Sequence, residues 1–162
     1  MSVLTTASTR NARPRTGRRT AEGLIVSYIH HNGKLGALVE VNCETDFVAR
    51  TDEFRELARR LAEQVAATAP VAVDLDAIPF ELLERKREAY EQETRLANKP
   101  EHLVPKIVAG KIDAFLRDVT LLEQPWVREP GMRVRELVDD VAAKTGENIQ
   151  VRRFSRFHMG LA

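Results

Sequence analysis

The fold is decided by residues 23–43, which read GLIVSYIHHNGKLGALVEVNC. Apolar and polar side chains alternate on both sides of the Asn32-Gly33 pair, as they do in strands with one buried face. Asn-Gly between alternating runs is the strongest short-range signal of a β-hairpin, because both residues accept the positive φ angles of a type I′ turn. We therefore expect a hairpin with Asn32 and Gly33 at its turn.

Four helices are expected after the hairpin. The first begins after Thr51, a good N-cap, and ends before Pro70. The others are expected at about residues 79–98, 101–117 and 133–145. The helix at 79–98 is so rich in charge that we expect it to be largely exposed and to protrude, whereas the helix at 101–117 has a continuous apolar face.

A last strand is expected at about residues 148–157, after an extended connector at 119–127 in which Pro125 argues against a central strand. A lone hairpin is marginal in water, so this strand should complete a three-stranded antiparallel sheet. Simple alternation places Ile149, Val151, Arg153, Ser155 and Phe157 on one side of it. The predicted fold class is α+β, with helices on one face of the sheet. Because the other face also carries apolar residues from all three strands, we expect a homodimer through that face.

Composition indicates one folded domain with a basic tail. The chain has 162 residues, 43% apolar and 30% charged, and its apolar runs are far shorter than the roughly 20 residues of a membrane span. Residues 1–20 hold five of the 25 basic residues and no acid, so we expect a disordered tail there, although transit peptides share this composition. Residues 21–162 keep 20 basic against 24 acidic residues, which does not favour general binding of nucleic acid or membrane surfaces. The single cysteine favours a cytoplasmic protein.

Covalent chemistry has weak support in the sequence. A small dimeric α+β enzyme could use His31, Cys43 and Glu44, which are the candidate reactive side chains near the hairpin. The ligand spacings of zinc sites are absent, and adjacent residues such as His30 and His31 on a strand should point to opposite faces. No glycine-rich nucleotide loop is present either. We therefore expect no metal, no cofactor and no catalytic centre.

The last strand offers a further alternative. Arg152, Arg153 and Arg156, with Phe154 and Phe157 between them, resemble the interleaved basic and aromatic residues of an RNA-binding strand. Aromatic residues on such a strand are more often part of a core, and arginines on both faces favour pairing with carboxylates. An RNA-binding protein therefore remains an alternative, and direct nucleic-acid contact is not expected.

The segment from Glu44 to Val48, between the hairpin and the first helix, has two interpretations. In one, Thr45 or Asp46 caps the helix and Phe47 folds into the core. In the other, Phe47 is an exposed aromatic anchor with a polar neighbour, of the kind that protein interfaces use. Periodicity does not decide between them.

Several strings together resemble the elongation factor Ts family. They are residues 21–25 (AEGLI), 41–50 (VNCETDFVAR), 121–125 (LLEQP), 146–149 (GENI) and 152–154 (RRF). The resemblance covers about residues 20–162, the core or dimerisation domain, and it is closest to the short bacterial form with one core subdomain. The string at 42–49 is highly specific.

The resemblance implies a function. The family binds elongation factor Tu and speeds release of GDP, so that GTP can rebind, and it performs no covalent chemistry. The segment that acts corresponds to Thr45, Asp46, Phe47 and Val48. The resemblance further implies that the phenylalanine enters a pocket between switch-region helices of the G domain and that the aspartate contacts the same region. The magnesium site is disturbed as a result, and the phosphate loop changes conformation.

The sequence departs from the family pattern at two places. Members normally begin with a small helical domain that carries a Thr-Gly-Ala-Gly-Met-Met-Asp type of motif, and residues 1–20 contain none of it. We expect an error in the start or reading frame, the alternative being a truncated paralogue. Some short relatives carry a cysteine in the Arg-Phe-x-Arg-Phe string that links two chains. Ser155 stands there in this chain, so a dimer would be non-covalent at this position.

Overall fold

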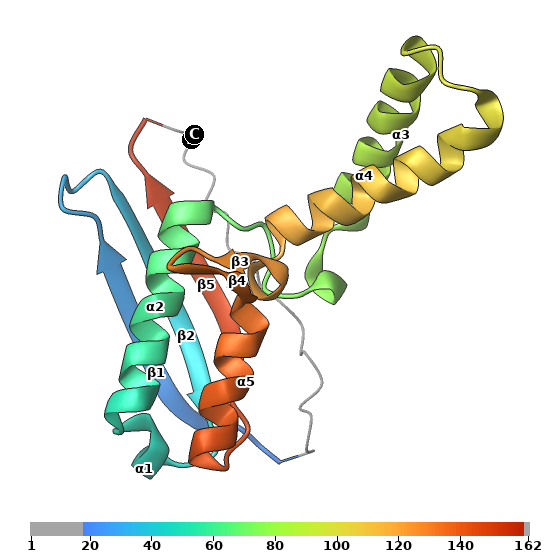
Figure 1. Cartoon of the computed structure of the whole chain (residues 1–162). Coiled ribbons are helices and arrows are strands. Elements are labelled where there is room, and N and C mark those ends of the chain that lie inside the picture. The colour runs from blue at the N-terminus through green and yellow to red at the C-terminus, as the bar shows by residue number, and fades with distance from the viewer. Residues whose placement is uncertain (1–17, 161–162) are drawn as a thin grey trace.

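A three-stranded antiparallel sheet forms the centre of the molecule, in a computed structural model that describes residues 18–160. Its strands are β1 (Glu22–Ile29), β2 (Leu35–Cys43) and β5 (Gln150–His158), in the order β1-β2-β5 (Figure 1). The predicted hairpin and the late third strand are confirmed, and so is the α+β class. Most of the predicted tail, residues 1–17, lies outside the described residues.

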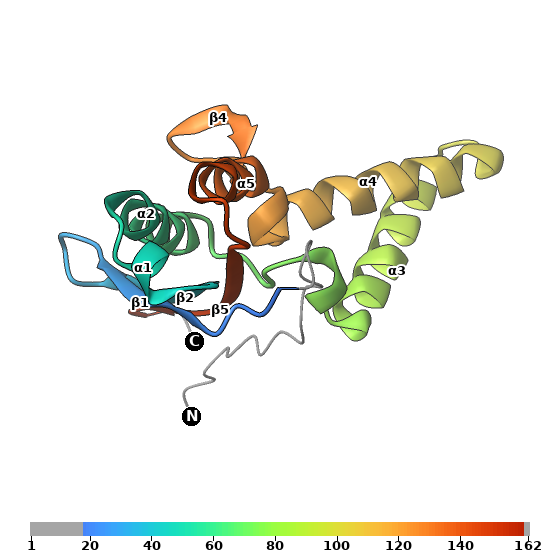
Figure 2. The same cartoon turned by 90° about the horizontal axis from the view of Figure 1, so that it is seen from below.

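Helices cover one face of this sheet. The α-helices are α1 (Asp46–Ala49), α2 (Asp52–Thr68), α3 (Phe80–Leu96), α4 (Val104–Val119) and α5 (Val134–Thr145). Short 3-10 turns are η1 (Leu75–Ala77), η2 (Glu101–Leu103) and η3 (Leu121–Glu123). Helices α2 and α5 lie side by side over the sheet, and no described helix lies on its opposite face (Figure 2). None of the described helices combines the length and apolar character that crossing a bilayer requires.

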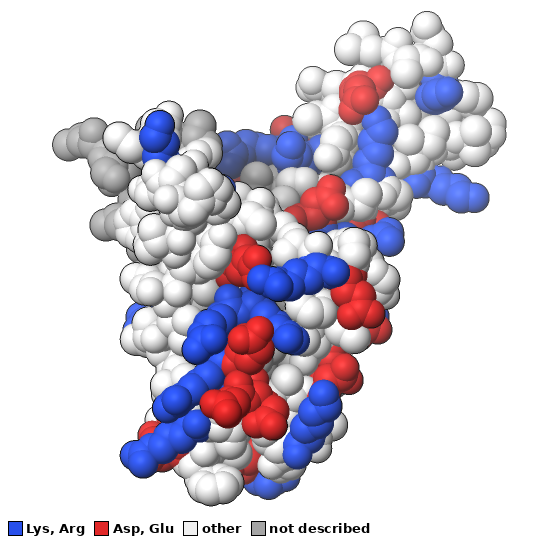
Figure 3. Space-filling model, turned by 60° about the vertical axis from the view of Figure 1, so that its left-hand side comes forward, with Lys and Arg blue, Asp and Glu red and all other residues white. Residues whose placement is uncertain are grey.

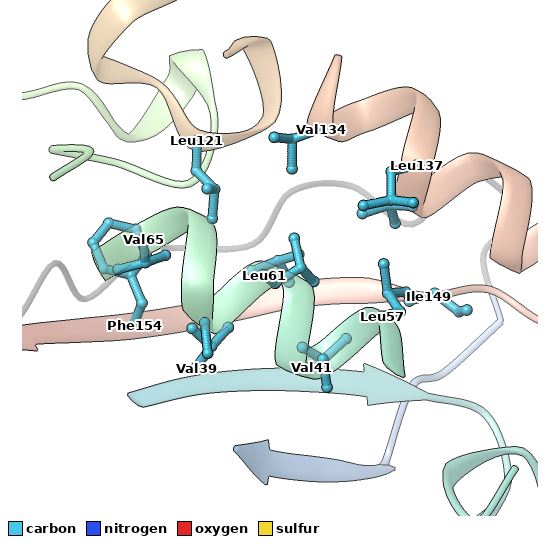
Figure 4. Packing of buried hydrophobic residues seen from close by; sticks show 14 of the residues in the cluster. Val39, Val41, Leu57, Leu61, Val65, Leu121, Val134, Leu137, Ile149 and Phe154 are labelled. Atoms are coloured by element: carbon cyan, nitrogen blue, oxygen red, sulfur yellow. The ribbon is translucent and has the colours of Figure 1, made fainter. Parts of the chain in front are cut away.

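The main core lies between the sheet and these two helices. Helix α2 presents Leu57, Leu61 and Val65 at helical spacing, and these side chains meet the β2 residues Val39 and Val41 (Figure 4). From the other side, α5 contributes Val134 and Leu137. The predicted N-cap is confirmed, because the Thr51 hydroxyl accepts a hydrogen bond from Phe54 N at 3.3 Å. The Thr51 cap therefore marks where α2 begins, directly after the segment that follows β2.

The hairpin turn differs from the predicted type I′ turn. Gly33 has a positive φ of 67°, but Asn32 does not, and Gly33 N donates to His30 O at 2.8 Å. Leu35 O accepts a hydrogen bond from His30 N, so the loop holds the four residues 31–34. Loops of this length are most often built around a type I turn, and here Gly33 is the one left-handed residue. Asn32 instead uses its side chain, which accepts from Lys34 N at 3.0 Å.

The alternation predicted for the last strand is wrong at its start. Glu40 pairs with Arg153 and Val41 pairs with Val151, so Arg152 is an extra residue in a β-bulge. The bulge lets Val151 and Phe154 both reach the helix-covered face, although an uninterrupted strand would place them on opposite faces. Beyond the bulge the alternation holds.

The connector before α5 contains a small second sheet that the sequence did not predict. Strand β3 (Pro125–Trp126) pairs with β4 (Glu129–Arg133). The buried Gln64 of α2 holds it, since its amide donates to Pro125 O and accepts from Val127 N. Such a buried amide has to be hydrogen-bonded, and only the folded chain supplies the partners.

Helices α3 and α4 form a hairpin that projects from the body of the protein (Figure 1). Its own small core joins Val104, Val108 and Ile112 of α4 to Leu83 and Tyr90 of α3. Apart from this contact α3 is largely exposed, and Thr94 is its one buried residue. The predicted protruding, solvated helix is confirmed.

The face of the sheet opposite the helices is apolar in part, as predicted. Strand pairing aligns Ser27, Leu38 and Ser155 in one row, and Ile29, Gly36 and Phe157 in the next. The large apolar side chains exposed on this face come from all three strands and are Ile25, Ile29, Leu38 and Phe157. In a third row, Glu40 is paired with Arg153 at 2.6 Å. We call the side of the sheet that carries these three rows the open face.

Candidate functional site

The segment between β2 and α2 forms a single helical turn at one end of the sheet (Figure 1). Thr45 is its N-cap, and its hydroxyl accepts a hydrogen bond from Val48 N at 3.3 Å. The buried Cys43, the last residue of β2, donates its thiol to Thr45 O at 3.2 Å. The sequence expectation of a threonine cap is confirmed, and the four predicted residues 45–48 lie together on this turn.

Phe47 points away from the core. It is 81% exposed, whereas Val48 is 5% and Ala49 is 2% exposed. Successive residues of a helix point about 100° apart, so a turn that buries residues 48 and 49 turns residue 47 outward. The interpretation in which Phe47 folds into the core is therefore wrong, and the exposed arrangement is the one that forms. A large aromatic side chain that is mostly exposed on a capped turn can serve as an anchor in a contact with another protein.

Asp46 lies beside Phe47 and is also exposed. Its carboxylate pairs with Arg50 at 2.6 Å, one helical turn later. Both side chains are more than half exposed, so this pair adds little to stability. A partner protein with its own polar groups can therefore replace Arg50 as the partner of the Asp46 carboxylate with little loss of stability.

A further residue at this site was missed by the sequence analysis. The carboxylate of Glu147, at the turn after α5, accepts hydrogen bonds from the backbone N–H groups of Glu44 and Thr45. The sequence places Glu147 about a hundred residues away, and no local pattern links the two turns. The one available signal is that residues 44–48 and 146–149 both belong to the strings that resemble one family.

Cys43 is buried and chemically quiet at neutral pH. Burial raises the pKa of its thiol from the ordinary 9.0 to about 11, and the nearby carboxylate of Glu147 adds to the rise. The folded state favours the neutral thiol, so the contribution of Cys43 to the free energy of unfolding is fully present below about pH 9. That contribution is lost as the pH rises through 11.

We predict that Cys43 in the native chain resists iodoacetamide at pH 8, where about one thiol in a thousand is ionised. Between pH 9 and 11 the free energy of unfolding should fall by up to about 1.4 kcal/mol per pH unit more than in Cys43→Ala. Alkylation followed by mass spectrometry and urea unfolding at each pH check this. Alkylation as fast in the native as in the unfolded chain would contradict it.

The residues that a small enzyme would need are not brought together. His31 lies at the turn of the β-hairpin, while Cys43 pairs with Glu22 at the opposite end, about 25 Å away along the strands. His30 and His31 do not point to opposite faces as predicted: their rings are 4.2 Å apart, because β1 ends at Ile29. Within residues 18–160 no group of three His, Cys, Asp or Glu side chains could hold a metal ion.

The arginines of β5 are engaged within the chain. Arg153 forms the ion pair with Glu40, and Arg156 donates to Ala66 O at 2.9 Å. On the face of the molecule shown in Figure 3, basic and acidic side chains interleave and form no single basic patch. Arg128 and Glu63 also form an ion pair, 2.8 Å apart. The expected carboxylate pairing is found for Arg153, whereas Arg156 binds a backbone carbonyl instead.

Comparison with known proteins gives one consistent result. The family described as Elongation factor TS matches residues 11–161. Elongation factor Ts of Thermotoga neapolitana is 48% identical over 149 residues, which cover 92% of this chain and 75% of that protein. Elongation factor Ts of Oleidesulfovibrio alaskensis is 51% identical over the same shares of the two chains. The chain belongs to the elongation factor Ts family.

Proposed function

We propose that this chain is a guanine-nucleotide exchange factor for elongation factor Tu, and that Phe47 is the side chain that acts on the partner. Family membership supports the partner, since the role of the family is nucleotide exchange on elongation factor Tu. The observation that carries the residue assignment is the exposure of Phe47 on a turn whose next two residues are buried. Asp46 is its polar neighbour, and Thr45 and Val48 hold the turn.

Insertion of one aromatic side chain is enough to matter at a nucleotide site. Magnesium requires near-ideal octahedral oxygen geometry, so a small shift of its protein ligands weakens its binding. The bound exchange factor then lowers the affinity for the nucleotide. The bound nucleotide lowers the affinity for the exchange factor by the same factor, because one coupling free energy links the two sites. Burial of a phenylalanine supplies roughly 1.5–3 kcal/mol, and each tenfold loss of nucleotide affinity needs about 1.4 kcal/mol. Larger effects require further contacts.

The test is release of a fluorescent GDP from purified elongation factor Tu, with and without the chain. We expect release to be accelerated in proportion to the concentration of the chain until the partner is saturated. No acceleration by a chain shown to be folded by circular dichroism would overturn the proposed function. Hydrolysis of GTP by the chain alone, with no elongation factor Tu present, would also do so, because it would indicate an enzyme.

We further propose that the open face is covered by a second copy of the chain. Its apolar side chains come from three adjacent strands, and a self-complementary sheet face is the surface that a two-fold dimer uses. Leu38 lies in the middle strand between Ser27 and Ser155, so the centre of the contact would be one large apolar side chain flanked by two small ones. Such packing of two sheets needs no covalent link.

We predict that Leu38→Glu shifts the chain from a dimer to an 18.3 kDa monomer, because it places a charge at the centre of the contact. Light scattering after size exclusion measures this. Val127→Glu is a matched control, since Val127 is 41% and Leu38 is 44% exposed but Val127 lies outside the sheet. A wild-type chain that is monomeric at tens of micromolar would contradict the proposed dimer.

A further inference from the structure

Two turns that are far apart in sequence exchange hydrogen bonds beside Phe47. One oxygen of the Glu147 carboxylate accepts from Glu44 N and from Thr45 N, each at 3.0 Å, and the other accepts from Thr45 Oγ1 at 2.5 Å. In return, the carboxylate of Glu44 accepts from Asn148 N at 2.6 Å. Each glutamate thus binds the backbone of the other's turn. We call this arrangement the Glu44–Glu147 tie.

The tie supplies partners that the backbone lacks at this point. Strand β2 ends at Cys43 and α1 begins at Asp46, so the N–H groups of Glu44 and Thr45 lie outside both the strand and the helix. A carboxylate that receives both is a charge-assisted acceptor, which is roughly twice as strong as a neutral one. The direction in which the chain leaves the sheet is therefore set by a side chain from the end of α5.

The contacts continue from Glu147 to the exposed aromatic ring. The Thr45 hydroxyl donates to Glu147 and also accepts from Val48 N, so one side chain joins the tie to the first turn of α1. A helix of four residues has almost no stability of its own, because nucleation is unfavourable. The shape of the turn that carries Phe47 thus depends on its cap and on the buried Val48.

We propose that Glu147 is a positioning residue for nucleotide exchange: through the Glu44–Glu147 tie it holds the Thr45 turn so that Phe47 is presented in one orientation. This inference rests on the proposed function of Phe47. Without the tie, residues 44–46 sample more conformations, and a partner captures only the fraction that presents the ring correctly. The apparent affinity falls by that fraction.

The test compares Glu147→Ala, Glu147→Gln and wild type in release of fluorescent GDP from elongation factor Tu. We expect Glu147→Ala to need roughly tenfold more protein for the same acceleration, which corresponds to about 1.4 kcal/mol. Glu147→Gln should recover part of this loss, because its amide oxygen still accepts from both backbone N–H groups although its NH2 group cannot accept from the Thr45 hydroxyl. The maximal rate at saturation should change little, since Phe47 itself is intact.

A matched control and a local measurement separate positioning from general damage. Glu136→Ala removes a carboxylate that accepts from Arg133 N at 2.7 Å at the other end of α5, and it should leave exchange unchanged. In Glu147→Ala, hydrogen exchange should become faster at the amides of Glu44, Thr45 and Val48, while amides of the α2 core stay protected.

The outcomes are distinguishable. Wild type and Glu147→Ala that are equally active overturn the inference and leave the proposed function intact. A tenfold loss that glutamine does not restore, together with loss of protection throughout α2, also overturns it. No acceleration by folded wild type overturns the proposed function and this inference with it. If Glu147→Ala does not fold, Thr45→Ala removes the hydroxyl that links the tie to α1, and a several-fold rise in the concentration needed is then expected.

Discussion

Phe47→Ala is expected to reduce the acceleration of GDP release by about 10- to 100-fold at subsaturating concentrations. The reason is that the ring is 81% exposed in the free chain, so most of its apolar surface is available for burial against the partner. Loss of a burial worth roughly 1.5–3 kcal/mol gives a factor of this size. Stopped-flow release of fluorescent GDP from elongation factor Tu measures it.

The matched control is Phe80→Ala, which removes a phenylalanine that is 69% exposed at the start of α3. It makes the same chemical change on a similarly exposed ring outside the candidate site, and it should exchange like wild type. Both variants should unfold within about 0.5 kcal/mol of wild type, because an exposed ring adds little to stability. Equal losses in the two variants would contradict the role assigned to Phe47.

Phe54→Ala is expected to lower the free energy of unfolding by about 3–5 kcal/mol. Phe54 lies in the first turn of α2, seven residues after Phe47, and it is fully buried in the main core. Truncation leaves a cavity beneath the helix in addition to the lost apolar burial. Urea unfolding at one fixed protein concentration measures the change, because a dimer makes stability depend on concentration.

The two phenylalanine variants should therefore give opposite results. Phe47→Ala should lose exchange and keep stability, whereas Phe54→Ala should lose stability and, where it remains folded, keep exchange. A Phe54→Ala chain as stable as wild type would mean that the core repacks around the gap. A Phe47→Ala chain that unfolds easily would mean that the ring is part of the core.

Local signals explain why much of the fold could be predicted. Alternation across Asn32-Gly33 specified two paired strands, and Thr51 followed by helical spacing specified the start of α2. Such signals act within a few residues, where side-chain direction and capping are fixed by the backbone itself. The α3–α4 hairpin could be predicted for the same reason, because a helix dominated by charged residues cannot be buried on all sides.

Two predictions failed because a distant residue decides the local shape. The bulge at Arg152 depends on pairing with Glu40 and Val41, more than a hundred residues earlier. The small β3–β4 sheet depends on Gln64 of α2, whose amide meets the backbone of the connector. Neither partner is visible in the segment itself, so alternation and turn rules gave the wrong answer for one and none for the other.

At the candidate site the division is equally clear. The sequence alone determined which residues form the segment, since residues 42–49 identify it, and it determined that Thr45 can cap a helix. Only the tertiary structure decided that Phe47 faces solvent, because the core buries Val48 and Ala49 from the same turn and this turns Phe47 outward. It also brought Glu147 to Thr45. Composition and residue spacing are properties of the sequence itself. Exposure and hydrogen-bond pairing depend on which distant segments pack against a residue.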